Sequence, residues 1–518
     1  MATSACGAPP EPQAPGNDTP APAPKAAETD LSTELPKVEL KGTAYRPEGL
    51  GRPPMPIVEG KKKVTIEKQR TIVAKAKEGA IREAMSQILA TLLYQASKAE
   101  SGGKETALLE EGRSVMREAL KTAASPPDSN TLRMLGVFEI LLGDYAAATK
   151  AWEQLTNLDP ADKEVDHFRA WWAYSALTSG DEAGALAALK GFEPDLKSPE
   201  LAYMMAWVRW RAGDNAGAWK ALRAAAIGWP EKVKGSVIER DLILLAGRTF
   251  APIEEAVAVA TAFAGPAKAD QYAMLFKISQ SMTSAGRYQD TIAAIDAALR
   301  AVGTEVPKQD PPKLRFQQAE LTLRFDDPVA GARFGKQAIN ALLTCGDACT
   351  DRADVAAAIQ RIATFYHSIY ATSQDIRFYA PAREIYSAVI GASEGEKKAE
   401  VLKLSDQLDK TKRAIRPGGG IHDKEIVAAL LGLHAQEILA CYEATLAGNP
   451  KVTGSLVLSL EFDAKGGVTG ATSTPPAGED EVAEVAECSL ERARLWRLPA
   501  RGKPGVTRVK LSYELSSP

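Results

Sequence analysis

Histidine is scarce in this sequence, and the two signs of charge almost cancel. Four histidines in 518 residues argue against a metal enzyme built on several imidazole ligands. The 63 lysines and arginines against 66 aspartates and glutamates leave a net charge of −3, without the basic excess of a dedicated nucleic-acid binder. No run of about 18 apolar residues is present, so we expect no transmembrane helix. Hydrophobic residues make up 45% of the chain, which is enough for a sizeable core and excludes wholesale disorder.

Motifs that carry chemistry are also missing. The histidines are scattered, and none has an obvious nucleophile nearby; they are His167, His367, His422 and His434. The Cys-x-x-x-Cys of residues 345–349 lacks the four ligands that a structural zinc site needs. Gly466–Gly470 lacks the lysine and the following helix of a phosphate loop. We therefore predict a non-enzymatic protein without cofactor or metal. The alternative is an enzyme whose site is assembled around His167 and neighbouring aromatic residues.

The amino-terminal segment is rich in proline, with 12 of the 32 prolines in the first 60 residues. Proline lacks a backbone donor and disfavours helix in the residue before it. We therefore expect residues 1–62 to form a disordered, extended tether. Its Thr3-Ser4-Ala5-Cys6-Gly7 resembles the end of a bacterial lipoprotein signal, although the apolar core of such a signal is absent from the five preceding residues. The resemblance implies lipidation at Cys6 and an envelope location, while a cytoplasmic protein with a stray cysteine is the alternative.

Residues 63–416 carry an internal repeat of helix-forming sequence. Glycines at 143, 180, 213, 247 and 286 are separated by steps of 37, 33, 34 and 39 residues. Each predicted unit is a helix, a glycine turn in the left-handed conformation and a second helix. One hairpin cannot bury its apolar faces alone, so the units should stack into a solenoid. Further irregular hairpins are expected from the segments 66–98, 104–124, 314–342, 354–371, 376–392 and 398–415.

The best repeat unit, Ser129 to Pro160, resembles a tetratricopeptide repeat. It has Leu135-Gly136 in the first helix, Gly143 and Tyr145 at the turn, and Ala148 and Trp152 in the second helix. A generic all-α protein with coincident turns is the alternative. The resemblance implies that protein partners lie along a concave face lined by first helices. The residues expected there are Asn130, Arg133, His167, Ala170, Tyr174, Tyr203, Trp207 and Trp210.

An aromatic face of this kind suits an extended or helical apolar peptide, because aromatic residues are enriched at interaction hot spots. Seven of the eight tryptophans lie between residues 152 and 229. The alternative is that these rings form the core between stacked hairpins, and we expect this of Trp152, Trp172 and Trp219. For Tyr203, Trp207 and Trp210 both interpretations stay open.

Pro417-Gly418-Gly419-Gly420 ends the array, and we predict a hinge over residues 417–422. The residues that follow, 423–518, change to an α+β pattern. Alternating apolar residues predict strands at 455–462 and 508–515, with a weaker strand at 468–474 after a turn at 463–467. Helices are expected over 423–446 and 479–495.

This end segment resembles the AgmX/PglI C-terminal domain, a relative of the TonB C-terminal domain of envelope proteins. The matching residues are Cys441-Tyr442-Glu443, Leu446, Asn449-Pro450, Gly454, Gly466, Gly467, Cys488, Trp496-Arg497-Leu498-Pro499 and Tyr513. The resemblance implies a disulfide between Cys441 and Cys488, and the two helices that carry them must cover the same sheet face. Cys345 and Cys349 are a second candidate pair. Reduced thiols in a cytosolic protein are the alternative.

These observations predict a mainly α protein: a disordered tether, a tetratricopeptide-like solenoid and a small TonB-like α+β module. The function we expect is that of a non-enzymatic envelope scaffold for protein partners, without nucleic-acid binding. Membrane contact would come only through a lipid at Cys6. In TonB-like modules exposed strands pair with partner strands, so the terminal strand Val509–Leu515 is a second candidate contact. A cytoplasmic scaffold and an enzyme remain the alternatives.

Overall fold

The computed structural model describes residues 29–516, except 31–34, 49, 61–63, 124–125, 194–196, 229–235, 250–252, 266, 303–306, 416–419, 450 and 475–481. Cys6, Trp229 and residues 417–419 of the predicted hinge lie outside the described residues.

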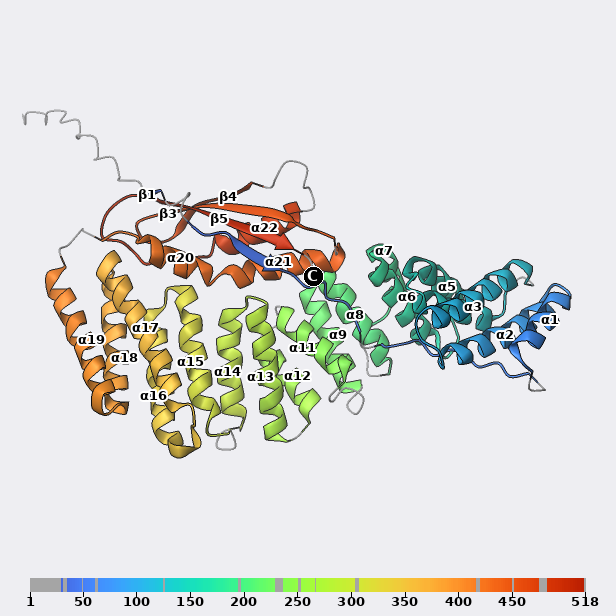
Figure 1. Ribbon diagram of the computed structural model, residues 1–518, viewed down its shortest axis with the longest axis horizontal. Coiled ribbons are helices and arrows are strands. Elements are labelled where there is room, and N and C mark those ends of the chain that lie inside the picture. Colours follow the sequence, from blue (N-terminus) through green and yellow to red (C-terminus); the bar gives the residue numbers. More distant parts are fainter. Residues whose placement is uncertain are drawn as a thin grey trace, which may run out of the picture.

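Most of the described chain is a row of antiparallel helical hairpins (Figure 1). The first half comprises α1 (Ile66–Lys75), α2 (Ala80–Ser97), α3 (Gly103–Thr122), α4 (Ser129–Leu141), α5 (Tyr145–Leu158), α6 (Val165–Ser179), α7 (Glu182–Ala188), α8 (Pro199–Arg211) and α9 (Asn215–Gly228). The second half comprises α11 (Val237–Arg248), α12 (Ile253–Ala264), α13 (Lys268–Ser284), α14 (Tyr288–Val302), α15 (Asp310–Thr322), η2 (Leu323–Phe325), α16 (Pro328–Cys345), η3 (Gly346–Ala348), α17 (Arg352–Ser373), η4 (Ile376–Phe378), α18 (Tyr379–Ala392) and α19 (Gly395–Ala414). Each hairpin packs on the next, so the predicted solenoid of tetratricopeptide-like hairpins is confirmed.

A Gly-Asp pair makes the turn in three of the repeats. Gly143, Gly180 and Gly213 have φ of 76°, 84° and 75°, a left-handed conformation that ends the first helix without a Cβ clash. The aspartate that follows each glycine accepts a hydrogen bond from the backbone N–H three residues later. This side-chain cap begins the second helix, so two adjacent residues fix both ends of the turn.

Gly247 is the exception among the five repeat glycines. It lies inside α11, so its assignment as a turn glycine is wrong. A Cβ at this position would lie 2.5 Å from the carbonyl carbon of Ser281 in α13. Gly247 is therefore required for the close approach of two helices, whereas Gly286, with φ of 71°, makes the next turn as predicted.

The carboxy-terminal module is a sheet with helices on one face. Its elements are α20 (Lys424–Gly432), α21 (Ala435–Gly448), β3 (Gly454–Phe462), β4 (Val468–Thr474), α22 (Val482–Ala493) and β5 (Thr507–Ser516). β3 is antiparallel to both β4 and β5. The alternate residues of β3 and β5 are buried, as the period-2 pattern predicts. The predicted single helix over 423–446 is two helices, and the first ends at Gly432.

Two short strands from the amino-terminal segment complete the sheet. β1 (Thr29–Asp30) and β2 (Val38–Lys41) pair in parallel with the outer edge of β5, with Val38 opposite Tyr513. The prediction of a disordered tether over 1–62 is therefore wrong for residues 29–30, 35–48 and 50–60. Proline content hid the alternating Val38-Glu39-Leu40-Lys41, of which Leu40 is buried in the core of the module. Residues 1–28 lie outside the described chain.

The module is docked along the ends of the array helices. Figure 1 shows α20 and α21 lying across the array. The backbone N–H of Ile421 donates to the Thr372 carbonyl at 3.0 Å, and the N–H of Ala500 donates to Asp375 at 3.0 Å. At the middle of the array, a Cβ on Gly286 would lie 2.8 Å from the Glu437 side chain. Ile421 of the predicted hinge and residues of the module beyond it are thus held against the array, so the module is not a freely hinged unit.

Within the described residues, one helical stretch is long and apolar enough to span a membrane by length and composition. This stretch, Lys424–Gly448, has 25 residues, and an 18-residue window within it has a mean hydropathy of 1.3. It consists of α20 and α21, whose Ile438, Tyr442 and Leu446 are fully buried against the sheet. These contacts are those of core helices in the folded module.

Candidate partner-binding surfaces

An extended segment of the chain itself lies on the array. We call residues 38–58 the strap, and we call the surface formed by α2, α4, α6, α8 and α11 the first-helix face, because each of these helices opens a hairpin. The strap leaves the sheet at β2 and runs along the first hairpins toward α1 (Figure 1). Met55 of the strap is buried in the core of the array, and the Val58 N–H donates to Thr91 of α2 at 3.2 Å.

The strap is anchored most closely near the start of α11. The backbone N–H of Glu48 donates to the Asp241 carboxylate at 2.8 Å, and its carboxylate pairs with Arg240. Upstream, Arg211 donates to the carbonyl of Tyr45 at 3.4 Å. The first-helix face therefore holds an extended polypeptide, and that polypeptide is the chain's own amino-terminal segment.

Two aromatic residues for which partner contact and core had both stayed open are buried. Tyr203 and Trp207 have no exposed surface, so the core interpretation is right for them and their assignment as partner-contacting residues is wrong. Every residue from Leu201 to Val208 is buried, because α8 packs against α6, α9, α11 and α21. The Tyr203 hydroxyl donates to Asp241, and Tyr203 thereby supports the carboxylate that holds the strap. Burial is the main cause that raises the pKa of Asp241.

Trp210 lies at the other end of α8 and faces the module. It is half-buried, and its ring meets that of Trp207 edge-on at 5.7 Å. It lines a cleft of about 180 Å³ together with Ala440, Cys441 and Cys488. The ring is thus directed toward the interface between array and module and not toward an open groove. The rings expected in the core, Trp152, Trp172 and Trp219, are buried as predicted. Ala170, which was expected on the partner-binding face, is also fully buried, so its assignment as a partner-contacting residue is wrong.

Four predicted contact residues stay partly exposed on α4 and α6: Asn130, Arg133, His167 and Tyr174. Arg133 pairs with Glu164 at 2.7 Å and lies 5.5 Å from the Phe168 ring. The Trp171 indole donates to Nε2 of His167 at 3.2 Å, and burial, followed by the charge of Arg133, lowers the pKa of His167. The structure thus places Arg133 and His167 together, and their role in partner binding stays a prediction.

The outer edge of the terminal strand is partly occupied. β5 pairs with β3 on one side, and on the other it pairs with β1 at Thr507 and Arg508 and with β2 from Tyr513 to Ser516. The prediction that Val509–Leu515 is exposed for strand addition is therefore wrong for residues 513–515, where β2 occupies the position that a partner strand would take. Among the described strands, the unpaired edge of the sheet on the opposite side belongs to β4.

Array, module and strap meet at one buried ion pair that sequence reasoning missed. Arg248 of α11 lies 2.7 Å from Glu443 of α21, with side-chain exposures of 4% and 6%. The Tyr45 ring lies 4.2 Å from the Arg248 guanidinium, and its hydroxyl donates to Glu443 at 3.3 Å. Desolvation raises the pKa of Glu443, against the opposing effect of Arg248. The only sequence signal was the position of Glu443 in the motif Cys441-Tyr442-Glu443.

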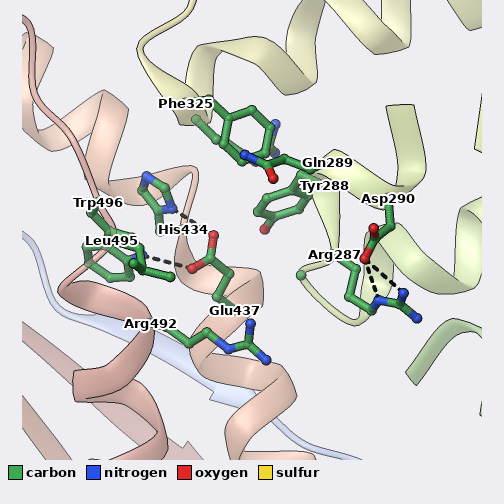
Figure 2. A pocket seen from close by; sticks show the side chains of 12 residues that line it. Arg287, Tyr288, Gln289, Asp290, Phe325, His434, Glu437, Arg492, Leu495 and Trp496 are labelled. Atoms are coloured by element: carbon green, nitrogen blue, oxygen red, sulfur yellow. Dashed lines mark hydrogen bonds and ion pairs between the residues drawn. The ribbon is translucent and has the colours of Figure 1, made fainter. Parts of the chain in front are cut away.

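A cleft between array and module has a volume of about 440 Å³. Figure 2 shows His434, Glu437 and Trp496 facing Tyr288 and Arg287 across it. Nδ1 of His434 lies 2.9 Å from Glu437, which also accepts from the Trp496 indole at 2.8 Å. The His434 and Trp496 rings are stacked at 4.5 Å. The residues that line this cleft include a histidine–carboxylate pair but no serine, threonine or cysteine. The histidine could act as a base, but the lining supplies no hydroxyl or thiol of these three types for it to activate.

Both expected disulfides are present. Cys441 of α21 is bonded to Cys488 of α22, and Cys345 is bonded to Cys349 at the end of α16. The first bridge ties together the two helices that cover the sheet. No cluster of three or more histidine, cysteine, aspartate or glutamate side chains suited to a metal ion occurs in the part of the chain that the structure describes.

No protein-family model matches the chain, and no curated protein matches it. Among solved structures, the crystal structure of the P58(IPK) TPR domain is 12% identical. The match covers 68% of this chain and 99% of that chain, with a TM-score of 0.19. At this similarity the match carries no argument, and the repeat architecture rests on the hairpins and turns described above.

Proposed function

We propose that this protein is a non-enzymatic scaffold of the cell envelope that binds protein partners through its first-helix face and its carboxy-terminal module. The observation that carries the proposal is the strap, an extended segment held along the first helices by main-chain and side-chain contacts. A surface that holds an extended peptide in this way is suited to peptide recognition.

The envelope location is supported by the two disulfides, since such bonds persist in oxidising compartments. The order of helices and strands in the module supports the proposed likeness to AgmX/PglI and TonB end domains. A lipid at Cys6 would hold the protein at a membrane. A cytoplasmic scaffold is the alternative, and it requires the four described cysteines to be reduced in cells.

Two experiments test the proposal in the native cell. Acid quenching followed by thiol alkylation and mass spectrometry reports the oxidation state of the cysteines; free thiols at Cys441 and Cys488 would favour the cytoplasmic alternative.

For partner binding, a photo-crosslinking amino acid is placed at Asn130 or Tyr174, with Lys220 on α9, the second helix of its hairpin, as the matched control position. Discrete crosslinked proteins are expected from the first two positions and not from Lys220. Crosslinks from none of the three would remove the first-helix face as the binding surface.

A further inference from the structure

The strap connects two surfaces that are otherwise separate. Its strand β2 pairs with the outer edge of β5 from Tyr513 to Ser516, and its following residues contact the first-helix face at Arg211, Asp241 and Thr91. We propose that the β5 edge and the first-helix face form one continuous track, that the strap is its resident ligand, and that a partner protein binds by inserting an extended segment in place of the strap. This inference rests on the proposed function and names the chemistry of the partner.

Five strap residues show what the track recognises. Leu40 enters the core of the module, and Gly42 packs so closely on α21 that a Cβ would lie 2.6 Å from Leu446 and 2.7 Å from Tyr442. Tyr45 stacks on Arg248, Pro47 is buried, and Glu48 binds Arg240 and Asp241. The partner segment is therefore extended and carries Leu-x-Gly-x-x-Tyr-x-Pro-Glu or a close equivalent: a short strand, then an aromatic residue, then an acid.

The folded body keeps its polar groups paired when the strap leaves. Glu443 retains Arg248, and Asp241 retains the Tyr203 hydroxyl. Arg211 retains the Leu177 carbonyl at 2.9 Å, and the Thr91 hydroxyl retains the Gln87 carbonyl at 3.0 Å. Release of the strap thus creates no unpaired buried charge at these positions, which is the main cost of breaking a buried polar contact.

Along β2 the strap is held by main-chain pairing and by one buried side chain, Leu40. β2 has four residues, and Lys37, Glu39 and Lys41 point their side chains into solvent. Exposed ion pairs contribute little to stability, and short edge strands open more readily than central ones. A partner that offers the same main-chain hydrogen bonds to β5 can therefore replace β2 without unfolding the sheet.

Hydrogen exchange on the full-length, unmodified protein is the first test. The amides of the strap from Val38 to Gly42, together with those of Glu48 and Val58, should exchange at least about 100-fold faster than the β3 amides that bond β5. This difference is expected if the strap opens while the rest stays folded. Strap amides that exchange only with global unfolding would overturn the inference, because the strap would then be a fixed part of the fold.

Binding of a labelled peptide covering residues 37–58 is the second test. In full-length Gly42→Val, the new side chain collides with Tyr442 and Leu446, so the strap should leave and the peptide should bind at least about tenfold more tightly than to the wild type. Lys41→Ala, which changes an exposed side chain, should behave like the wild type. A peptide that itself carries Gly42→Val should not bind. Equal, negligible binding of the unchanged peptide to all three proteins would overturn the inference.

A separate version keeps the test valid if Gly42→Val does not fold. A protease site replaces Lys61-Lys62-Lys63, the purified chain is cut there, and excess peptide should exchange with the cut strap. Failure to exchange overturns the inference. Light scattering of the wild type at rising concentration distinguishes a partner protein from a second copy of this chain as the ligand of the track. If dimers form, the strap of a second copy and not a partner protein occupies the track. If Asn130 gives crosslinks while the strap amides exchange only with global unfolding, the proposed function stands and only this inference is overturned.

Discussion

Arg248 and Glu443 form a buried ion pair, 2.7 Å apart, that joins the helical array to the carboxy-terminal module. Tyr45 of the strap covers the pair from a third part of the sequence. The two carboxylate oxygens of Glu443 accept from different donors. Oε2 accepts from Arg248, while Oε1 accepts from the Tyr45 hydroxyl and the Thr43 N–H. The junction thus makes the relative position of three chain segments depend on one charge pair.

Replacing Arg248 with methionine should destabilise the protein by about 3–5 kcal/mol at pH 7, because it leaves the Glu443 charge buried without a counter-ion. Urea denaturation measures the loss. The double variant Arg248→Met/Glu443→Leu is the control and should lose less, since no charge remains. An equal loss in both variants would show that packing and not charge is decisive.

The same single variant should show a defined pH dependence. Without Arg248, burial is opposed only by the hydrogen bonds from Thr43 and Tyr45, so the pKa of Glu443 in the folded protein rises further above the unfolded value of about 4.3. The folded state then binds the proton more tightly than the unfolded state. The deficit of Arg248→Met relative to the wild type should therefore shrink as the pH falls from 7 toward 4.5.

His422 should make the module sensitive to acid. Its Nε2 donates to the Pro499 carbonyl and its Nδ1 accepts from the Thr507 hydroxyl, both at 2.7 Å. Burial lowers its pKa to about 4, so the folded state resists protonation. The stability that the neutral ring provides is complete above about pH 6.5 and is lost as the pH falls toward 4, by at most roughly 3 kcal/mol.

The measurement is the stability difference between the wild type and His422→Gln at several pH values. A difference is needed because Asp326, whose pKa burial raises to about 6, acts in the opposite direction: its contribution falls as the pH rises from about 4 to 6. The wild type should lose its advantage over His422→Gln between pH 6.5 and 4. A constant difference over this range would show that His422 does not titrate with folding.

Local patterns in the sequence were enough to predict the repeats and the module. The spacing of apolar residues and the Gly-Asp turns are set within a few residues, so the hairpins from Ser129 to Gly228 follow from the sequence. The strands β3 and β5 follow from period-2 alternation. The end of α20 at Gly432 could have been predicted from that glycine, but the apolar periodicity continues on both sides of it and indicated a single helix.

The strap was missed because its contacts are long-range. Val38 pairs with Tyr513, and Glu48 with Asp241, and no local pattern in a proline-rich segment indicates either partner. The same fact explains the error at Tyr203 and Trp207. A helical periodicity identifies an apolar face, but it does not show that α8 is surrounded by other helices on its remaining sides.

Gly143 and Gly247 should respond in opposite order to alanine and asparagine. Gly143 has positive φ and open space around it, so Gly143→Ala should cost about 1–2 kcal/mol and Gly143→Asn less, because asparagine tolerates the left-handed conformation. Gly247 is helical and lies against Ser281. Gly247→Ala should cost about 1–3 kcal/mol through overpacking, and Gly247→Asn more. Thermal or urea unfolding of the four variants tests this, and the same order at both sites would contradict the distinction.

The two disulfides should differ in their effect on stability. In the chain-entropy model the contribution grows with the length of the closed loop. Cys441–Cys488 spans 47 residues and Cys345–Cys349 spans 4, which corresponds to about 4 and about 2 kcal/mol. Cys441→Ala/Cys488→Ala should therefore lose more stability than Cys345→Ala/Cys349→Ala in urea denaturation without reductant. With reductant both bridges open, so the wild type should be less stable than the first double variant measured without reductant, by about the 2 kcal/mol of the shorter bridge. A wild type whose unfolding midpoint is the same with and without reductant, while all four thiols are shown to be reduced, would contradict this ranking.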